Sequence, residues 1–275
     1  MTIPMVTDDE IKAFEEDGVI CLRQRFELHW LESLAEGFEK NLAAPGPNSS
    51  QLTPEGNPGG YFDDFLVWHR IQEYRDFIFD SPAAEIAARL MSSDTCRHFL
   101  ENALIKEPGT REVAPWHQDA IFTTMDAHHI LQLTVWLPLC DATEENGCLQ
   151  VSPGVHEERV VYWRGIERKD SVSVPMNKGD VIFIHKLCPH GSGPNQTDGI
   201  RWSMDIRYQK SGGPSPRPEW PSLIARSRRD PSSETPYENW RDAWAAALEK
   251  HPKKLGREKP SEAQPYTGEM YLEER

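Results

Sequence analysis

The chain is 275 residues long, and its 38% hydrophobic and 9% aromatic content is that of a folded protein with a substantial core rather than of a disordered chain. Its 30 basic and 44 acidic residues give a net charge of −14, which argues against nucleic acid and anionic membranes as partners, because both attract basic surfaces. No apolar run approaches the roughly 18 residues that a membrane span needs, and the opening MTIPMVTDDE lacks the pattern of an export signal, so we expect a cytoplasmic protein.

The cysteines indicate neither a cross-linked nor a metal-binding framework. There are five of them, an odd number, and no two form a Cys-x-x-Cys pair. Disulfide scaffolds and thiolate zinc sites rely on paired or closely spaced cysteines, so we expect neither. Small buried thiols are the expected role.

The first residues carry helix signals. Thr7 and Glu10 have the spacing of a capping box, in which each side chain satisfies a backbone donor of the other residue, and this predicts a short helix. Gly18 supplies a left-handed stop before residues 19–22, which read as a strand. A second helix is predicted by four apolar residues at helical spacing, namely Leu31, Leu34, Phe38 and Leu42.

A loop and a further helix are predicted before residue 96. Residues 44–60 (APGPNSSQLTPEGNPGG) are too rich in Pro, Gly and Ser for regular structure. We expect a long loop there, which is typical of a lid, a binding loop or simple disorder. Ser81 followed by Pro82 predicts the start of a helix that runs to about Met91.

From about Cys96 to Lys210 the chain consists of short β-rich runs separated by turns. The clearest examples are residues 131–137, 180–185 and 201–208. Helices followed by strands predict an α+β protein whose body is a β-sandwich or jelly roll with flanking helices.

The remainder of the chain completes a predicted single domain. Residues 211–236 are interrupted by prolines, residues 237–250 read as a helix, and a charged tail follows. We expect one domain over residues 1–275, with a helical part and loop at 1–95, a jelly-roll core at 96–210, and a loop, helix and tail at 211–275.

The pair His117 and Asp119 is the first candidate for chemistry. In an extended chain, residues two apart face the same side, so these two present an imidazole and a carboxylate to a common point while Gln118 points elsewhere. The pattern His-x-Asp is common by chance, so the pair alone is weak evidence for a metal site.

A second histidine strengthens this interpretation. His190 follows the apolar run 180–185 within a glycine-rich segment, residues 188–195 (CPHGSGPN). Two imidazoles and one carboxylate bind three adjacent corners of an octahedral Fe(II) and leave three corners open, as in non-haem oxygenases. The residues therefore predict a reactive metal centre rather than a closed structural one.

The strand predicted at residues 201–208 has one polar face, which alternation assigns to Arg201, Ser203, Asp205 and Arg207. We expect this face to line a site. Arg201 offers a fork of donors to a carboxylate, and a fixed cation is needed to hold a dianionic co-substrate in a protein whose overall field repels anions. A surface ion pair is the alternative role for Arg201.

The motifs and their order resemble a known family. They are His117-Gln118-Asp119, residues 146–156 (NGCLQVSPGVH), and His190-Gly191-Ser192 followed by Asn195 and Arg201. Over roughly residues 11–210 the chain resembles the phytanoyl-CoA dioxygenase (PhyH) superfamily of Fe(II)- and 2-oxoglutarate-dependent oxygenases. It departs from the family's commoner Pro-Gly-Ser-His at Val155.

The resemblance implies a double-stranded β-helix, and an oxidoreductase that uses Fe(II), 2-oxoglutarate and O2. It implies His117, Asp119 and His190 as the iron ligands. In related halogenases the position of Asp119 is Ala or Gly, so the carboxylate favours hydroxylation, with desaturation or cyclisation left open.

The resemblance also implies a co-substrate pocket. Arg201 and Ser192 are expected to bind the far carboxylate of 2-oxoglutarate, and Trp136 is expected to line its pocket.

The substrate is the least defined feature, because the family includes enzymes for acyl-CoA esters, ectoine, organophosphonates, secondary metabolites and quaternary amines. The acidic chain speaks against a CoA ester. Aromatic and charged side chains can instead hold a small zwitterion, and the candidates here are Tyr61, Asp64, Trp68, Arg70 and Arg207. We expect a small charged metabolite, with 2-aminoethylphosphonate or its trimethylammonio analogue as the candidate substrate. Core packing is the alternative for this cluster.

Other functional classes stay open from the residues alone. A hydroxylase of an acyl-CoA or a secondary metabolite would use the same centre. A cupin-like metalloenzyme that does not use 2-oxoglutarate would not need Arg201, and a jelly-roll binding module would not need iron.

Overall fold

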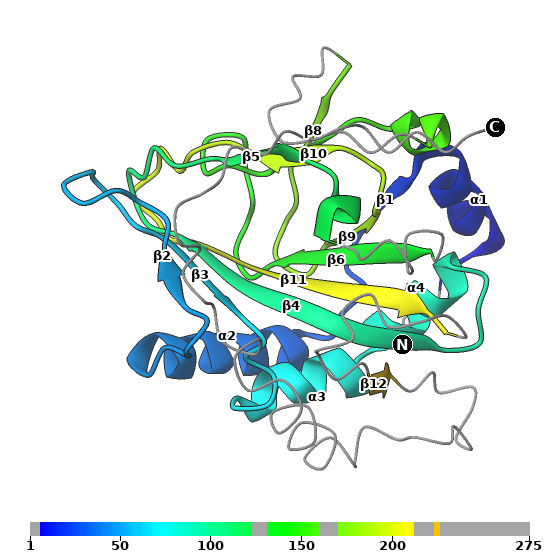
Figure 1. Ribbon diagram of the computed structural model, residues 1–275, viewed down its shortest axis with the longest axis horizontal. Helices are drawn as coiled ribbons and strands as arrows, with labels where there is room; N and C mark the ends of the chain where they lie inside the picture. The colour runs from blue at the N-terminus through cyan, green and yellow to red at the C-terminus, as the bar shows by residue number, and fades with distance from the viewer. Residues whose placement is uncertain (1–5, 123–130, 160–169, 212–222, 226–275) are drawn as a thin grey trace.

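The computed structural model describes residues 6–122, 131–159, 170–211 and 223–225. Within these residues, four helices and two antiparallel sheets form the fold (Figure 1). The helices are α1 (Asp8–Asp17), α2 (Leu28–Ala43), α3 (Gln72–Asp80) and α4 (Pro82–Leu90).

The larger sheet has eight strands in the order β1-β9-β6-β11-β4-β3-β2, with β12 added on β4. Its strands are β1 (Val19–Leu22), β2 (Ser50–Gln51), β3 (Tyr61–Phe65), β4 (Cys96–Lys106), β6 (Gln132–Pro138), β9 (Val181–His185), β11 (Arg201–Lys210) and β12 (Leu223–Ala225). The smaller sheet has four strands in the order β5-β10-β7-β8, which are β5 (Ala114–His117), β7 (Leu149–Val151), β8 (Val172–Val174) and β10 (His190–Ser192).

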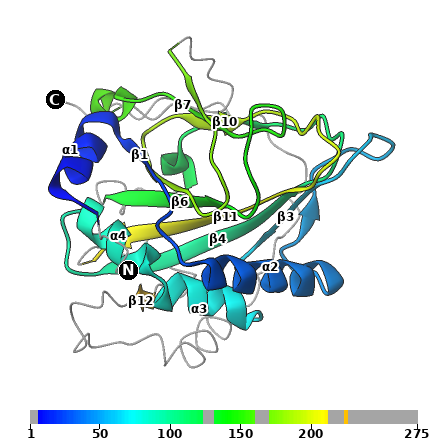
Figure 2. The same cartoon turned by 180° about the vertical axis from the view of Figure 1, so that it is seen from behind.

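The elements form layers. Helices α2 and α3 lie along one face of the larger sheet, and the smaller sheet lies on the opposite side, as Figure 1 and Figure 2 both show. Two facing antiparallel sheets with helices outside them are the α+β jelly roll with flanking helices that the sequence predicted, and the fold class is confirmed.

Local signals position the helices as expected. Both hydrogen bonds of the Thr7 and Glu10 capping box are present, and Gly18 ends α1 in the left-handed conformation with a φ of 68°. The Ser81 side chain accepts a hydrogen bond from the backbone N–H of Ala83, with Pro82 in the first turn of α4. These caps satisfy backbone groups that a helix end would otherwise leave unpaired.

One expected core position lies outside the core. Leu31, Leu34 and Phe38 of α2 are buried, but Leu42 is 41% exposed. The buried stripe ends instead at Asn41, one residue earlier, whose side-chain oxygen accepts a hydrogen bond from Arg70. A helical stripe drifts with a period of 3.6 residues, so position 41 rather than 42 stays in line with it.

Strand alternation divides the interior into two cores. In β9, Phe183 packs with the residues under the helices, whereas Ile182 and Ile184 pack between the two sheets. In β11, Met204 and Ile206 face the helices. The predicted polar face of β11 therefore points into the space between the sheets.

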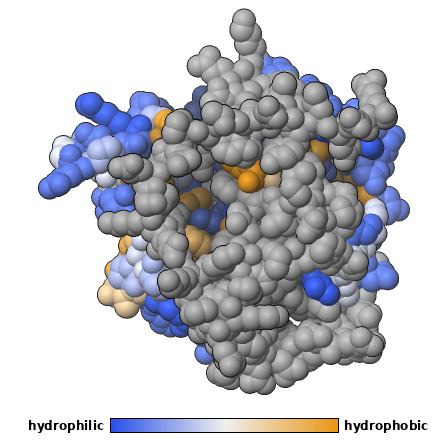
Figure 3. All heavy atoms as spheres, in the orientation of Figure 1, coloured by the Kyte–Doolittle hydropathy of each residue, from blue (hydrophilic) through white to orange (hydrophobic). Residues whose placement is uncertain are grey.

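Two short strands were not expected. Residues 44–60 were predicted to be irregular, but β2 pairs there with β3, and the loop between these strands projects from the molecule with a largely hydrophilic surface (Figure 1 and Figure 3). Strand β12 pairs with β4 inside the proline-interrupted region. The helix predicted at residues 237–250 lies outside the described residues.

All five cysteines are free, in agreement with the sequence interpretation, and Cys96, Cys148 and Cys188 are buried. Burial raises the pKa of the Cys188 thiol to about 12, so this group is a neutral packing residue at physiological pH. Within the described part of the chain, no helix has the length and apolar character that a membrane crossing requires.

Asn195 ties the turn after β10 to the end of β4. Its side-chain amide is fully buried and donates to the carbonyl oxygens of Lys106 and Gly199, at 3.0 and 2.7 Å. Its own oxygen accepts from the backbone N–H of Thr197 at 3.1 Å.

We expect Asn195→Ala to lower the free energy of unfolding by about 3 kcal/mol, because several buried backbone groups lose their partners at once. Urea unfolding of the purified chain measures this. The neighbouring exposed side chain provides the control, and Gln196→Ala should change stability by less than about 0.5 kcal/mol. Equal stabilities of the two variants would contradict the assignment.

Candidate metal centre

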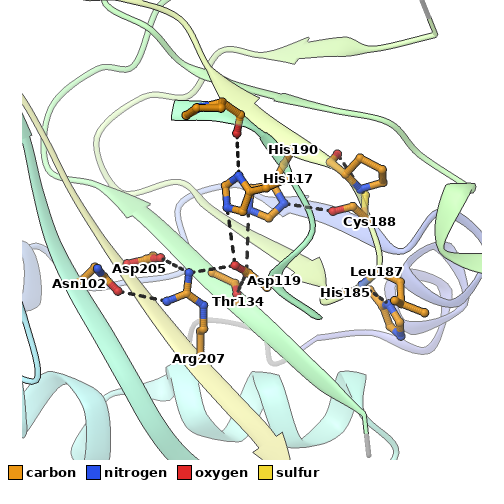
Figure 4. A network of polar contacts seen from close by, with 12 residues as sticks. Asn102, His117, Asp119, Thr134, His185, Leu187, Cys188, His190, Asp205 and Arg207 are labelled. Atoms are coloured by element: carbon orange, nitrogen blue, oxygen red, sulfur yellow. Dashed lines mark hydrogen bonds and ion pairs between the residues drawn. The ribbon is translucent and has the colours of Figure 1, made fainter. Parts of the chain in front are cut away.

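Two histidines and one aspartate meet between the sheets. The strand β5 ends at His117 and β10 begins at His190, and these two residues are direct partners across the β5–β10 pair. Their Nε2 atoms lie 3.7 and 3.8 Å from the carboxylate oxygens of Asp119 (Figure 4). One ligand atom from each residue lies within 4.8 Å of the others, so the three could hold one metal ion. No other trio of His, Cys, Asp and Glu in the described ranges comes together in this way.

The local backbone differs from the expected extended chain. The strand ends at His117, and Asp119 is the first residue of a short 3-10 helix, Asp119–Phe122. Between them, Gln118 turns away and donates to the carbonyl of Leu187 at 2.6 Å. The strand end and the buried Gln118 therefore aim the two side chains at the same point.

Each imidazole is oriented by a backbone carbonyl. The Nδ1 atom of His117 lies 2.7 Å from the oxygen of Pro115, and that of His190 lies 3.0 Å from the oxygen of Cys188. A carbonyl can only accept, so Nδ1 is the donor and the Nε2 lone pair is available for a metal. Burial, together with His190, lowers the pKa of His117 to about 4, so this ring is neutral near pH 7 as metal binding requires.

Asp119 is only 3% exposed yet keeps its charge. Burial acts to raise its pKa, but the Arg207 guanidinium holds the pKa well below its usual range. Arg207 Nη2 donates to one carboxylate oxygen at 2.9 Å, and the Thr134 hydroxyl donates to the other. The result is an ionised oxygen donor fixed beside two nitrogen donors.

Arg207 itself is fixed from its other side. Its Nη1 donates to the side-chain oxygen of Asn102 at 3.1 Å, and its Nη2 lies 3.2 Å from Asp205 (Figure 4). The sequence interpretation named Arg207 as a substrate residue. The structure places it at the cavity wall with its guanidinium bonded to Asp119.

A cavity of about 700 Å³ opens beside the trio, and Arg201, Ser192 and Trp136 all line it. Arg201 is 1% exposed, its guanidinium carbon lies 5.6 Å from the centre of the Trp136 ring, and Nη1 donates to Ser203 at 2.5 Å. Its Nε has no hydrogen-bond partner. A buried guanidinium with an unsatisfied donor beside a cavity fits the carboxylate of a bound molecule.

Lys106 was not identified from the sequence. It is the direct partner of Arg201 across the β4–β11 pair, is fully buried, and donates to the Ser192 hydroxyl at 2.9 Å and to the Gly193 carbonyl at 2.5 Å. Burial and the nearby Arg201 lower its pKa to about 6. Only the strand register reveals this lysine, because it sits at the end of β4 with no motif around it.

The five expected substrate residues divide into two groups. Tyr61 and Arg207 line the cavity, whereas Asp64, Trp68 and Arg70 do not. Asp64 accepts from the backbone N–H of Gly46 at 2.8 Å and lies 3.4 Å from Arg70. Trp68 is 1% exposed and packs in the core under the helices.

Residues next to Asp64 on β3 line the cavity in its place. Asp63 and Phe65 line it together with Tyr61, because residues two apart on β3 share one face and Asp64 points to the other. The alternation of the strand could have been read from the sequence, but the face that meets the cavity is set by pairing with β4.

The ligand set suggests which metal would fit. Two imidazoles and one carboxylate on one side of a cavity leave the remaining coordination positions open, which is the facial arrangement of non-haem Fe(II) sites. The unsatisfied Arg201 donor within the same cavity suits a co-substrate with a carboxylate.

Comparisons with known proteins agree with this chemistry. A family model described as phytanoyl-CoA dioxygenase (PhyH) matches residues 14–203. The chain is 26% identical over 216 residues to a methylphosphonate hydroxylase of Gimesia maris, a match covering 74% of this chain and 80% of that protein. It is 30% identical over 226 residues to dioxygenase lolE1 of Epichloe uncinata, covering 74% of this chain and 83% of that protein.

A solved structure shows the same fold. The epimerase SnoN in complex with Fe3+, alpha ketoglutarate and nogalamycin RO matches with a TM-score of 0.63 and 20% identity. The match covers 76% of this chain and 92% of that one.

We expect a divalent metal ion to stabilise the chain through this centre. At a free concentration about 100 times the dissociation constant, Fe(II) under anaerobic conditions, or Mn(II), should raise the melting temperature by about 5 to 10 °C. His190→Ala should abolish the shift, measured by differential scanning calorimetry. His156→Ala, which changes a histidine outside the trio, should keep it. A full shift in His190→Ala would contradict the assignment.

Proposed function

Since the chain belongs to the phytanoyl-CoA dioxygenase (PhyH) family and is an Fe(II)- and 2-oxoglutarate-dependent dioxygenase, we propose that it hydroxylates an unactivated C–H bond of a small charged metabolite. Candidate substrates are 2-aminoethylphosphonate and its trimethylammonio analogue. The observation that carries the proposal is the meeting of His117, Asp119 and His190 beside the cavity that also contains Arg201.

His117, Asp119 and His190 are the proposed iron ligands. When bound, iron and 2-oxoglutarate supply the oxidation, in which dioxygen is consumed, succinate and CO2 are released, and one oxygen atom enters the substrate. The protein's part is to present two imidazoles and an ionised carboxylate, each fixed by a hydrogen bond from or to its neighbours.

Arg201, Ser192 and Trp136 form the proposed 2-oxoglutarate pocket, with Lys106 behind them. Neither Arg201 nor Lys106 forms an ion pair with an acidic residue of the described ranges, although both are buried. A buried guanidinium and a buried lysine without an acidic partner favour an anionic ligand. Because the Ser192 oxygen accepts from Lys106, its hydroxyl hydrogen is left to donate to a carboxylate.

The dimensions of the cavity support a small substrate. A volume of about 700 Å³ must accommodate both 2-oxoglutarate and the reacting part of the substrate. The Gimesia maris relative, named a methylphosphonate hydroxylase, supports an organophosphonate. The nogalamycin epimerase supports a second candidate, hydroxylation of a secondary metabolite.

The central experiment combines the full chain with Fe(II) and 2-oxoglutarate without oxygen and follows the visible charge-transfer band of the chelate. We expect the band to form, and 2-aminoethylphosphonate or its trimethylammonio analogue to perturb it. After oxygen is admitted, succinate and hydroxylated product should form in equal amounts. An unchanged rate of succinate formation with both compounds would contradict the proposed substrate class, while absence of the band would contradict the iron and co-substrate site itself.

Lys106 is expected to act as a positioning residue for the co-substrate. Lys106→Met should raise the KM for 2-oxoglutarate about tenfold and change kcat little, because one charge-assisted hydrogen bond network around Ser192 is lost. Arg201→Leu removes the group proposed to bind the carboxylate of 2-oxoglutarate directly, and should raise this KM about 100-fold. Iron affinity, measured by calorimetry, should stay unchanged in both variants.

The pH dependence distinguishes this role from simple packing. The pKa of Lys106 is lowered to about 6, and a bound carboxylate would raise it again, so binding takes up a proton above pH 6. The dissociation constant for 2-oxoglutarate should therefore increase from pH 6 to 8, by at most about tenfold per unit. The charged or titratable neighbours are Arg201, Tyr61 and Glu112, and burial raises the pKa of Tyr61 to about 12, outside this range. An equally steep dependence in Lys106→Met would overturn the assignment.

A further inference from the structure

Asp205 is a buried carboxylate with one unsatisfied oxygen. It lies on β11, is 7% exposed and lines the cavity. Its Oδ2 pairs with Arg207 at 3.2 Å, whereas Oδ1 has no hydrogen-bond partner. A buried carboxylate oxygen left unpaired costs free energy, which a ligand with a donor group would recover.

A second carboxylate lies beside it. Asp63, on β3, is 5% exposed and lines the same cavity. Its Oδ1 accepts from Asn102 at 2.7 Å, and Asn102 is the direct partner of Asp205 across the β4–β11 pair. Three adjacent strands therefore bring the two acids to one region of the cavity.

The guanidinium of Arg207 is the positive charge next to Asp205, and two carboxylates share it. Arg207 pairs with both Asp205 and Asp119. Burial raises the pKa of Asp205 to about 7, Arg207 acts to lower it, and Asp119, Asp63 and Glu101 act to raise it further. Since Asp119 is a proposed ligand of the metal ion, a positively charged ligand beside Asp205 would stabilise the ionised form of this second partner of Arg207.

Aromatic rings complete the surroundings. Phe65 and Phe99 line the cavity with the two acids, and Phe65 is the direct partner of Asn102 across the β3–β4 pair. Carboxylates together with ring faces are the usual elements of an ammonium-binding site. Of the arginines among the described lining residues, Arg201 belongs to the proposed co-substrate pocket and Arg207 is bonded to Asp119.

We propose that Asp205 and Asp63 bind an ammonium group of the substrate, which makes the substrate an amine or quaternary ammonium compound rather than a purely anionic one. This inference rests on the proposed hydroxylase function. A single guanidinium group separates Asp205 from Asp119, so the bound ammonium lies next to the metal centre and the carbon atoms near it are the ones presented for oxidation.

Matched pairs of compounds test the proposal. The first pair is 2-aminoethylphosphonate and propylphosphonate, and the second is choline and 3,3-dimethylbutan-1-ol, which replace the ammonium group by carbon. Binding to the full chain with Fe(II) and 2-oxoglutarate, without oxygen, is measured by calorimetry and by perturbation of the charge-transfer band. At least one ammonium compound should bind tenfold or more tightly than its carbon partner.

Variants then assign the preference to the two acids. Asp205→Asn and Asp63→Asn should each reduce the preference at least fivefold while leaving the dissociation constant for 2-oxoglutarate within twofold. Asp205→Asn removes a partner of Arg207 and could prevent folding. In that case Asp63→Asn alone decides the test. Asp64→Asn, on the opposite face of the same strand, is the matched control and should keep the preference.

Several outcomes would overturn the inference. These are equal binding of the carbon partners, failure of both ammonium compounds to bind, or a preference that survives in Asp63→Asn and in Asp205→Asn. Calorimetry separates this from failure of the proposed function, because an ammonium preference without any charge-transfer band would contradict the hydroxylase assignment and leave the ammonium site intact.

Discussion

A carboxylate that is almost completely buried must stay ionised if it is to bind a metal ion, and this requirement organises the centre of the molecule. Asp119 meets it because the Arg207 guanidinium offsets the cost of burial and holds its pKa well below the usual range. Arg207 depends in turn on Asn102 and Asp205, which come from neighbouring strands of the larger sheet. The charge of Asp119, a proposed iron ligand, thus depends on the strand pairing that positions Arg207.

Strands β4 and β11 carry basic side chains at one level of the cavity and an acidic side chain at another. Where Arg201 of β11 faces Lys106 of β4, both side chains are basic, and where Asp205 faces Asn102, the wall is acidic. An anionic co-substrate and a cationic substrate would each be attracted to one level and repelled by the other. The arrangement would keep the two molecules from exchanging places around the proposed iron ion.

The sequence predicted features that depend on local patterns. The caps of α1 and α4, the polar face of β11 and the jelly-roll class follow from spacing and alternation, and the structure confirms them. Features that depend on pairing between distant segments could not be predicted. Lys106 acquires its environment only through its register with Arg201, and the choice between Asp63 and Asp64 depends on which face of β3 meets the cavity. A single sequence contains alternation but not the pairing that orients it.

The regular pairing of the first residues of β11 has a consequence for the length of the substrate. Arg201 and Asp205 stand on the same side of this strand, four residues apart, and a strand rises about 3.3 Å per residue, so their backbones are separated by about 13 Å. The strand fixes the distance between the residue proposed to bind 2-oxoglutarate and the residue proposed to bind the amine. Because this separation sets where an amine would lie relative to 2-oxoglutarate, the length of the substrate as well as its charge would select which carbon is oxidised.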